Sequence, residues 1–259
     1  MKHSITEILN YLKSHVNEGI SIAEIANHFG YSKYHFSRTF KKITGFSPKS
    51  YLAAIKIEQS IEQLLKEKRT VLRAHLQVGY LSSSTFSQSF KDSTGLSPKQ
   101  YQLQVNQLHQ FLQEEAENID LRNTITYKGK LENTANQCHV YLKYPDSFNG
   151  GITFVGLFHH PIPDHSPIIG QAVLKKQHTS FINIPDGDFY LLACCIEKSH
   201  NPINYFVLKD ALRGKVEKRL SFNAEHPVHS VELQLRPPLP EDPPIIINLP
   251  QLLKEALMK

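Results

Sequence analysis

Residues 36–51 read FSRTFKKITGFSPKSY and residues 86–101 read FSQSFKDSTGLSPKQY, so the chain repeats itself with an offset of 50 residues. A Gly-Tyr pair precedes each copy, and the glycines of these pairs are Gly30 and Gly79. Such an internal repeat is typical of a duplicated supersecondary unit. Each copy is therefore predicted to belong to a unit made of a helix, a glycine turn and a second helix.

Capping residues predict where these helices begin and end. Ser21 and Glu24 have the spacing of a capping box, in which two side chains satisfy the free N–H groups of a helix start. Gly30 and Gly79 suit the left-handed conformation that ends a first helix. The second helices are likewise expected to end at glycines, namely Gly45 and Gly95.

Hydrophobic periodicity gives the second helix of each unit an inner face. At about 100° per residue, Phe36, Phe40 and Ile43 fall on one side of the first copy. Phe86 and Phe90 fall on the same side of the second copy. We expect all five in the core of one all-helical domain.

The opposite face of each second helix is polar and carries groups that recognise DNA. Arg38 can contact guanine with two hydrogen bonds in a major groove, and Gln88 can do the same with adenine. Solvated surface is the alternative interpretation of such faces. DNA binding is favoured because the polar sets recur together with the turns and caps. Five lysines are predicted to contact phosphates: Lys33, Lys41, Lys42, Lys49 and Lys91.

With these residues, the segment from about 5 to 102 resembles the DNA-binding domain of AraC/XylS-type transcription regulators. GYSKYHFSRTFKKITGFSPKSY in the first unit is similar to the form found in the MarA, SoxS and Rob branch. The resemblance implies two helix-turn-helix units, joined by a long helix, whose second helices enter successive major grooves. It also implies RNA polymerase as a partner. By position, it assigns base contacts to Tyr34, Ser37, Arg38, Ser83, Ser84 and Gln88.

The second unit departs from the family pattern. His75 stands where the first unit has the small Ala26, Gln88 replaces the family's usual arginine, and Gln102 replaces a common basic residue. These departures predict weaker base reading by the second unit. The domain also comes first in the chain, as in Rob-like proteins, whereas most family members carry it last.

Charge is distributed unevenly along the 259 residues. Residues 1–105 carry 14 Lys and Arg against 7 Asp and Glu, and the remainder carries 15 against 17. A basic first part beside a mildly acidic second part favours double-stranded DNA as a partner of residues 1–105. Because the sequence has neither a membrane-length apolar stretch nor a signal peptide, we expect a cytoplasmic protein without a membrane partner.

The residues that could carry chemistry do not indicate an enzyme. Cys138, Cys194 and Cys195 lack CxxC spacing, so buried free thiols are the favoured interpretation. The sequence has no nucleophile elbow, phosphate loop or HExxH helix. We therefore predict no catalytic residue, no metal and no cofactor.

The second half is predicted to form a β domain. Residues 106–122 have helical spacing and are expected to form a connector helix, and residues 123–259 an antiparallel β-sandwich. Prolines over 237–244 are expected to keep that segment on the surface, and LPQLLKEALMK is expected to form a terminal helix. The strand-like runs are CHVYLKY, ITFVGLF, SFINIP, DFYLLACCIE and VHSVELQLR.

Together these patterns predict a sequence-specific, AraC-type transcription regulator with residues 1–105 as its DNA-binding domain. The β domain would sense a small-molecule effector, form a homodimer or bind another protein. Two other classes stay open: a nonspecific architectural protein that binds nucleic acid, and an enzyme with a helical accessory domain.

Overall fold

Contacts divide the chain into a helical unit and a β unit. The helical unit comprises Met1–Gln104 and Leu239–Ile247, and the β unit comprises Val105–Pro238 and Asn248–Lys259. The predicted connector helix at 106–122 lies almost entirely outside the described residues. The computed structural model describes residues 3–65, 71–80, 82–105, 107, 110, 125–128, 134–163, 166–174 and 177–257.

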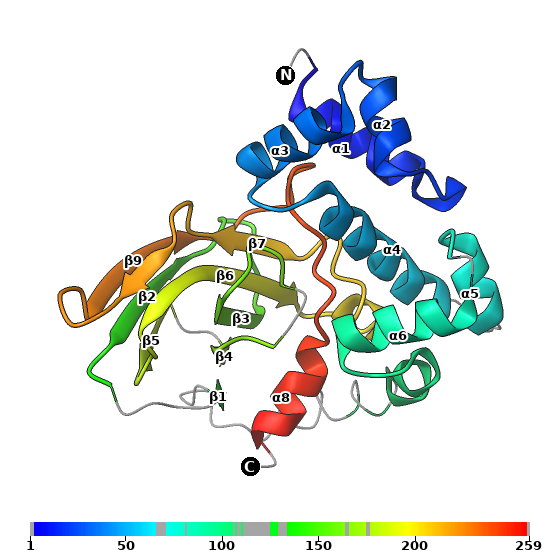
Figure 1. Cartoon of the computed structure of the whole chain (residues 1–259). Helices are drawn as coiled ribbons and strands as arrows, with labels where there is room; N and C mark the ends of the chain where they lie inside the picture. Colours follow the sequence, from blue (N-terminus) through cyan, green and yellow to red (C-terminus); the bar gives the residue numbers. More distant parts are fainter. Residues whose placement is uncertain are drawn as a thin grey trace. The chain divides into compact units, whose positions relative to one another are not determined.

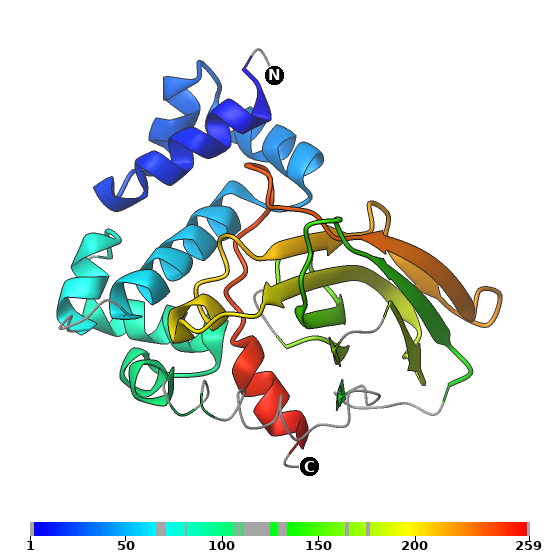
Figure 2. The ribbon, with the colours of Figure 1, turned by 180° about the vertical axis from the view of Figure 1, so that it is seen from behind.

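The helical unit places one long helix between two repeated helix pairs. Its helices are α1 (Ile5–Ser14), the 3-10 helix η1 (Val16–Glu18), α2 (Ile22–His28), α3 (Lys33–Thr44), α4 (Pro48–Leu65), α5 (Val71–Gln77) and α6 (Ser83–Thr94), and residues 98–105 are also helical. Helices α2 and α3 form the first pair, and α5 and α6 form the second. The 18 residues of α4 separate the pairs in the chain and pack against helices of both, as Figures 1 and 2 show from opposite sides.

The predicted capping box is present in the first pair, and the second helix of each pair also has a side-chain cap. Ser21 Oγ accepts a hydrogen bond from the Glu24 N–H, and the Glu24 carboxylate accepts one from the Ser21 N–H at 2.7 Å. These bonds lower the pKa of the Glu24 carboxyl because they stabilise its charged form. Ser32 and Ser82 cap α3 and α6 through the same kind of side-chain bond. Positive φ angles confirm the four predicted turn glycines: Gly30, Gly45, Gly79 and Gly95.

Aromatic rings fill equivalent core positions in the two pairs. The ring centroids of Phe36 and Phe40 lie 5.8 Å apart, and all four phenylalanines of the repeat are fully buried. The rings of Phe86 and Phe90 lie 5.7 Å apart. The predicted inner faces are therefore confirmed at their aromatic positions.

Ile43 does not take the predicted core position. Its side chain is 50% exposed at the last turn of α3. Beyond the turn, Phe46 is buried and packs on Phe40, with ring centroids 6.0 Å apart. The prediction for Ile43 is wrong because the aromatic residue that follows the turn fills the space at the end of the helix.

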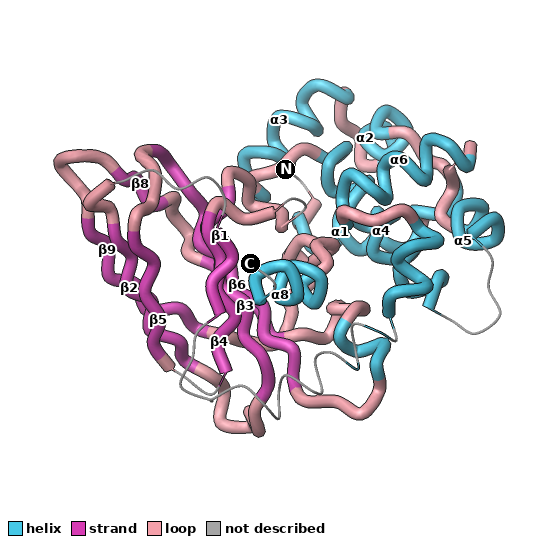
Figure 3. The backbone as a smooth tube through the Cα atoms, turned by 90° about the horizontal axis from the view of Figure 1, so that it is seen from below, coloured by secondary structure: helices cyan, strands magenta, loops and turns pink. Residues whose placement is uncertain are grey.

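The β unit contains two sheets. Its strands are β1 (Ile125–Lys128), β2 (Gln137–Lys143), β3 (Gly151–Phe158), β4 (Ile169–Leu174), β5 (His178–Ile182), β6 (Gly187–Glu197), β7 (Leu212–Lys215), β8 (Leu220–Phe222) and β9 (Val228–Gln234). The six-stranded sheet has the order β1-β4-β3-β6-β7, with β8 also paired to β6, and the three-stranded sheet has the order β5-β2-β9 (Figure 3). The 3-10 helix η2 (Pro202–Tyr205) follows β6, and α8 (Leu249–Leu257) forms the predicted terminal helix.

One strand pair corrects the prediction of an antiparallel domain. β2 and β9 run parallel, with Gln137 opposite Val228 and Lys143 opposite Gln234. A parallel pair requires a long crossover, and the strands β3 to β8 lie between these two in the chain. The other ladders in the described part of the β unit are antiparallel.

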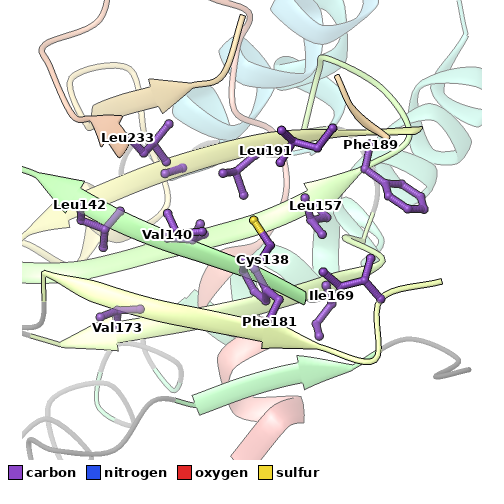
Figure 4. Packing of buried hydrophobic residues seen from close by; sticks show 14 of the residues in the cluster. Cys138, Val140, Leu142, Leu157, Ile169, Val173, Phe181, Phe189, Leu191 and Leu233 are labelled. Carbon is purple, nitrogen blue, oxygen red and sulfur yellow. The ribbon is translucent and has the colours of Figure 1, made fainter. Parts of the chain in front are cut away.

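Side chains from both sheets contribute to one hydrophobic core. Val140 of β2 and Phe181 of β5 come from the smaller sheet, and Leu157 of β3 and Leu191 of β6 come from the larger one. Figure 4 shows these side chains gathered in the space between the strands. The β unit therefore has its own core, as a separately packed unit needs.

The three cysteines are free and buried, which confirms the sequence interpretation. Burial raises the pKa of Cys138 and of Cys194 to about 12. It raises the pKa of Cys195 to about 11. These thiols are neutral at physiological pH and pack as small apolar groups.

A proline- and isoleucine-rich segment, Leu239–Ile247, leaves the β unit and joins the helical unit. We call it the strap. Lys13 Nζ of α1 donates a hydrogen bond to the Pro240 carbonyl oxygen at 3.0 Å. Asp242 and Pro244 are buried, so the prediction that residues 237–244 stay on the surface is wrong for the second part of that segment. The reason is that three consecutive isoleucines follow the prolines, and their burial removes a large apolar surface from water.

Candidate nucleic-acid interface

The outer face of α3 is open to solvent. Tyr34 is 77% exposed, Arg38 is exposed, and Ser37 is partly buried. Within the described part of the chain, the Arg38 guanidinium has neither a hydrogen bond nor an ion pair. Its donors are therefore available to an external acceptor.

The outer face of α6 matches that of α3 position by position. Each residue of 82–92 has the same degree of burial as its counterpart in 32–42. Ser83, Ser84 and Gln88 are all exposed in this arrangement. The repeat therefore presents two equivalent polar helix faces.

The two faces differ in charge. The sequence of α3 contains four basic and no acidic residues, whereas α6 contains one of each, Lys91 and Asp92. A polyanion is consequently attracted more strongly to α3. All five predicted phosphate-binding lysines are exposed: Lys33, Lys41, Lys42, Lys49 and Lys91.

Gln88 is held by a neighbour on its own helix. Its Nε2 donates a hydrogen bond to Asp92 Oδ1 at 2.7 Å. Asp92 occupies the position that Lys42 has in the first unit. The sequence prediction missed Asp92, although its spacing of four residues from Gln88 is the spacing at which helix side chains meet.

Helix α4 is bonded to the turn of the second pair through Lys56. The Lys56 ammonium donates a hydrogen bond to the Gly79 carbonyl oxygen at 3.1 Å and lies 5.2 Å from the centroid of the Tyr80 ring. Burial lowers the pKa of Lys56 because it disfavours the charged form. The turn that precedes α6 is thereby fixed on the long helix.

Features that would indicate catalysis, metal binding or a membrane span were also sought among the described residues. Asp186 accepts a hydrogen bond from Asn136 Nδ2 at 2.8 Å, and Asp188 accepts one from Ser221 Oγ at 2.5 Å. Among the described residues, no group of three or more His, Cys, Asp or Glu side chains could hold a metal ion. No helix in the same part of the chain has the length and apolarity that a membrane crossing requires.

Comparisons with known proteins identify the repeated helices. A family profile described as a helix-turn-helix domain matches residues 25–104. The chain is 32% identical over 83 residues to the probable transcription factor PqrA of Proteus vulgaris. The aligned segment covers 31% of this chain and 68% of PqrA. The chain belongs to the AraC-type helix-turn-helix family. The resemblance noted in the sequence is thereby confirmed.

Other relatives match over a segment of about the same length, which is a smaller share of their own chains. The transposon Tn10 TetD protein of Escherichia coli is 29% identical over 81 residues, which are 31% of this chain and 59% of that protein. The right origin-binding protein of Escherichia coli K12 is 32% identical over 81 residues, 31% of this chain and 28% of the relative. The chain thus spans less than two thirds of these two relatives.

A solved structure is also similar to the AraC-type part of this chain. The C-terminal domain of AraT, a response regulator from Geobacillus stearothermophilus, is 27% identical and covers 39% of this chain and 87% of its own, with a TM-score of 0.37. The AraC-type profile match ends at residue 104, so it does not describe the strands.

Proposed function

We propose that the protein is a sequence-specific DNA-binding transcription regulator whose helices α3 and α6 enter successive major grooves of one duplex. The observation that carries the proposal is the matched exposure of residues 32–42 and 82–92, which offers two equivalent polar faces. Membership of a family that includes the probable transcription factor PqrA supports it.

In this proposal α4 is the long helix that holds the two reading helices in place. It packs against both pairs and donates the Lys56 bond to the turn of the second pair. Successive major grooves on one face of a duplex lie about 34 Å apart, so both helices must be held at that repeat for simultaneous binding.

The proposed contacts divide into base readers and phosphate binders. Base edges are assigned to Tyr34, Ser37 and Arg38 of α3, and to Ser83, Ser84 and Gln88 of α6. Phosphates are assigned to Lys33, Lys41, Lys42, Lys49 and Lys91. The basic α3 supplies most of the salt-dependent affinity, because each cation that neutralises a phosphate releases counterions from the DNA.

The β unit is assigned a regulatory role, as a sensor of a small-molecule effector or as the surface for a homodimer. RNA polymerase is the proposed partner of the DNA-bound protein. A symmetric dimer would select a palindromic or repeated DNA site, whereas a monomer would select one asymmetric site that spans two turns. Selection of bound DNA sequences at two protein concentrations shows which kind of site is preferred. Analytical ultracentrifugation measures whether the protein is a monomer or a dimer at each concentration.

The test of the regulator proposal begins by selecting bound sequences from a random duplex pool with the full chain. Arg38→Ala and Lys42→Ala are then compared on the selected site and on random DNA. Arg38→Ala is expected to weaken binding to the selected site by about 1–3 kcal/mol and binding to random DNA much less. Lys42→Ala is expected to weaken binding to the selected site and to random DNA similarly. It should also reduce, by about one, the slope of the logarithm of the binding constant against the logarithm of the salt concentration.

Lys198→Ala is the matched control, because Lys198 is an exposed lysine of the β unit. It is expected to leave both affinities unchanged. Strong binding without enrichment of any sequence would indicate an architectural nucleic-acid-binding protein instead. Equal losses for Arg38→Ala on both DNAs would exclude base reading by this residue.

A further inference from the structure

One side of β9 carries backbone groups that point away from the rest of its sheet. β9 is an end strand of the order β5-β2-β9 and lies on the outside of the smaller sheet (Figure 3). The Gln137 N–H of β2 donates a hydrogen bond to the Pro227 carbonyl oxygen at 2.7 Å. At the other end of the strand, the Leu235 N–H donates one to the Lys143 carbonyl oxygen at 2.8 Å. The odd-numbered residues of β9 therefore face β2, and the N–H and C=O groups of the even-numbered residues point outward.

β7 closes one end of this outward side. Arg236, which follows β9, exchanges two backbone hydrogen bonds with Arg213 of β7, at 2.8 and 3.0 Å. The Gln234 carbonyl oxygen lies 3.1 Å from the position of a β-carbon on Gly214, so it is covered by β7 as well. The rest of this side has no backbone hydrogen bond to the described residues. We call this part the β9 edge, and it consists of three exposed residues: Val228, Ser230 and Glu232.

The opposite edge of the same sheet is covered. Gln171 of β4 donates a hydrogen bond from Nε2 to the Ser180 carbonyl oxygen of β5 at 2.9 Å, and it accepts one from the Thr179 hydroxyl. Proteins usually protect an open strand edge with lysine, proline, a bulge or a covering segment. β9 reads VHSVELQ, contains neither lysine nor proline, and pairs with β2 without a bulge. The β9 edge is therefore suited to pair with a further strand.

The β9 edge is complementary to itself. In an antiparallel pair around a two-fold axis at Ser230, this serine lies opposite its counterpart in a second copy, and Val228 lies opposite Glu232. Each of these pairs can exchange two backbone hydrogen bonds, so every open group finds a partner. An axis at Glu232 would instead place two carboxylates opposite each other. It would also require Gln234, which β7 covers.

We propose that the β9 edge is the homodimer surface of this protein, where two copies join their smaller sheets into one continuous sheet across a two-fold axis. The proposal rests on the homodimer alternative of the proposed function and names its surface. A second copy is the occupant because the register that uses every open residue puts an uncharged serine on the axis and brings no like charges opposite each other. Glu232 keeps its own cation, since Lys143 Nζ lies 3.7 Å from its carboxylate.

The experiment measures the association of the full chain by sedimentation equilibrium at about 1–200 μM protein. The wild type is expected to be in equilibrium between monomer and dimer. Ser230→Lys and Ser230→Glu each place like charges at the axis, so each should weaken the dimer at least about tenfold. An equimolar mixture of these two variants should recover the dimer, because opposite charges then meet. Ser147→Lys is the matched control and should behave as the wild type, because Ser147 is an exposed serine of the β unit outside β9.

Amide hydrogen exchange of the wild type, resolved by NMR, shows whether the backbone of β9 forms the contact. The three N–H groups of the β9 edge should exchange freely in dilute protein and become about tenfold slower as the dimer forms. The Val231 N–H faces β2 and should be protected at every concentration. This measurement needs no substitution, so it does not depend on how well a variant folds.

Three results would overturn the inference. They are a wild type that stays monomeric over the whole concentration range, a dimer that both charged variants retain, and a dimer in which the amides of the β9 edge stay unprotected. A monomer that still enriches a DNA sequence from a random duplex pool is a failure of the inference alone. A dimer with the expected behaviour that enriches no sequence is a failure of the proposed function alone.

Discussion

Gly79 lies against the backbone of Asn17: a β-carbon at residue 79 would stand 3.1 Å from the Asn17 carbonyl oxygen and 3.2 Å from the Gly19 nitrogen. The turn of the second helix pair therefore packs closely on the segment that precedes the first pair. Gly30, the equivalent residue of the first pair, has φ +70 against +67 for Gly79, but nothing lies within 4 Å of its β-carbon position. The two glycines have the same backbone conformation and different surroundings.

This difference predicts unequal costs for the same substitution. Gly30→Ala should destabilise the protein by about 1–2 kcal/mol, because a side chain is strained in the left-handed conformation. Gly79→Ala should cost about 1–3 kcal/mol more, because its methyl group also displaces backbone that cannot move freely. The free energy of unfolding of each variant is measured by urea denaturation, with the circular dichroism signal of the helices as the probe. Equal losses of stability would show that the Asn17 contact is not tight in solution.

The Lys56 bond predicts a second measurable loss. Lys56→Met keeps most of the apolar stem but removes the donor to the Gly79 carbonyl, and should cost about 1–2 kcal/mol of unfolding free energy. Lys49→Met is the control, since the Lys49 side chain is exposed and its ammonium has no hydrogen bond or ion pair to the described residues. It should change the stability by less than about 0.5 kcal/mol. A loss no larger than this for Lys56→Met would indicate that water replaces the ammonium at no cost.

The helical unit was predictable from sequence because its signals are local. Caps and turn glycines act within a few residues, and the internal repeat shows the turn glycines twice in the sequence. The Gln88–Asp92 bond is also local, but each of the two residues fits a solvated polar face by itself, so the polar pattern does not reveal the bond.

The β unit was less predictable because its decisive contacts join distant segments. The six residues of β4 are all buried, so the strand lacks the alternation that reveals a half-exposed strand. β7 and β8 have only 4 and 3 residues. The parallel pairing of β2 with β9 and the return of the strap to the helical unit depend on tertiary packing, which periodicity does not report.

The buried thiols predict a loss of stability at alkaline pH. The pKa of Cys138 is raised from 9.0 to about 12 in the folded protein. The contribution of the buried thiol to the free energy of unfolding is therefore fully present below about pH 9. It is lost as the pH rises toward 12, because the thiol ionises in the unfolded chain before it ionises in the folded protein. Each pH unit in this window removes at most about 1.4 kcal/mol per thiol.

Urea denaturation at pH 7, 9 and 10.5 tests this window. Cys138→Ala should lower the stability at pH 7, because it leaves a small cavity, but should show a shallower decline above pH 9 than the wild type. Comparison of the two proteins removes the contribution of the tyrosines, which they share. Identical slopes would mean that the Cys138 thiol ionises as readily in the folded protein as in the unfolded chain.

The strap makes the helical unit depend on residues near the end of the chain. Ile246 is 2% exposed and belongs to the helical unit, so Ile246→Ala should cost about 2–4 kcal/mol. Ile182 is 50% exposed at the end of β5, and Ile182→Ala should cost less than about 1 kcal/mol. Native-state hydrogen exchange should locate the effect of Ile246→Ala in the helices α1 to α6, with protection in β2 and β6 retained. If protection is lost in those strands and kept in the helices, the strap stabilises the β unit, and the helical unit does not need it.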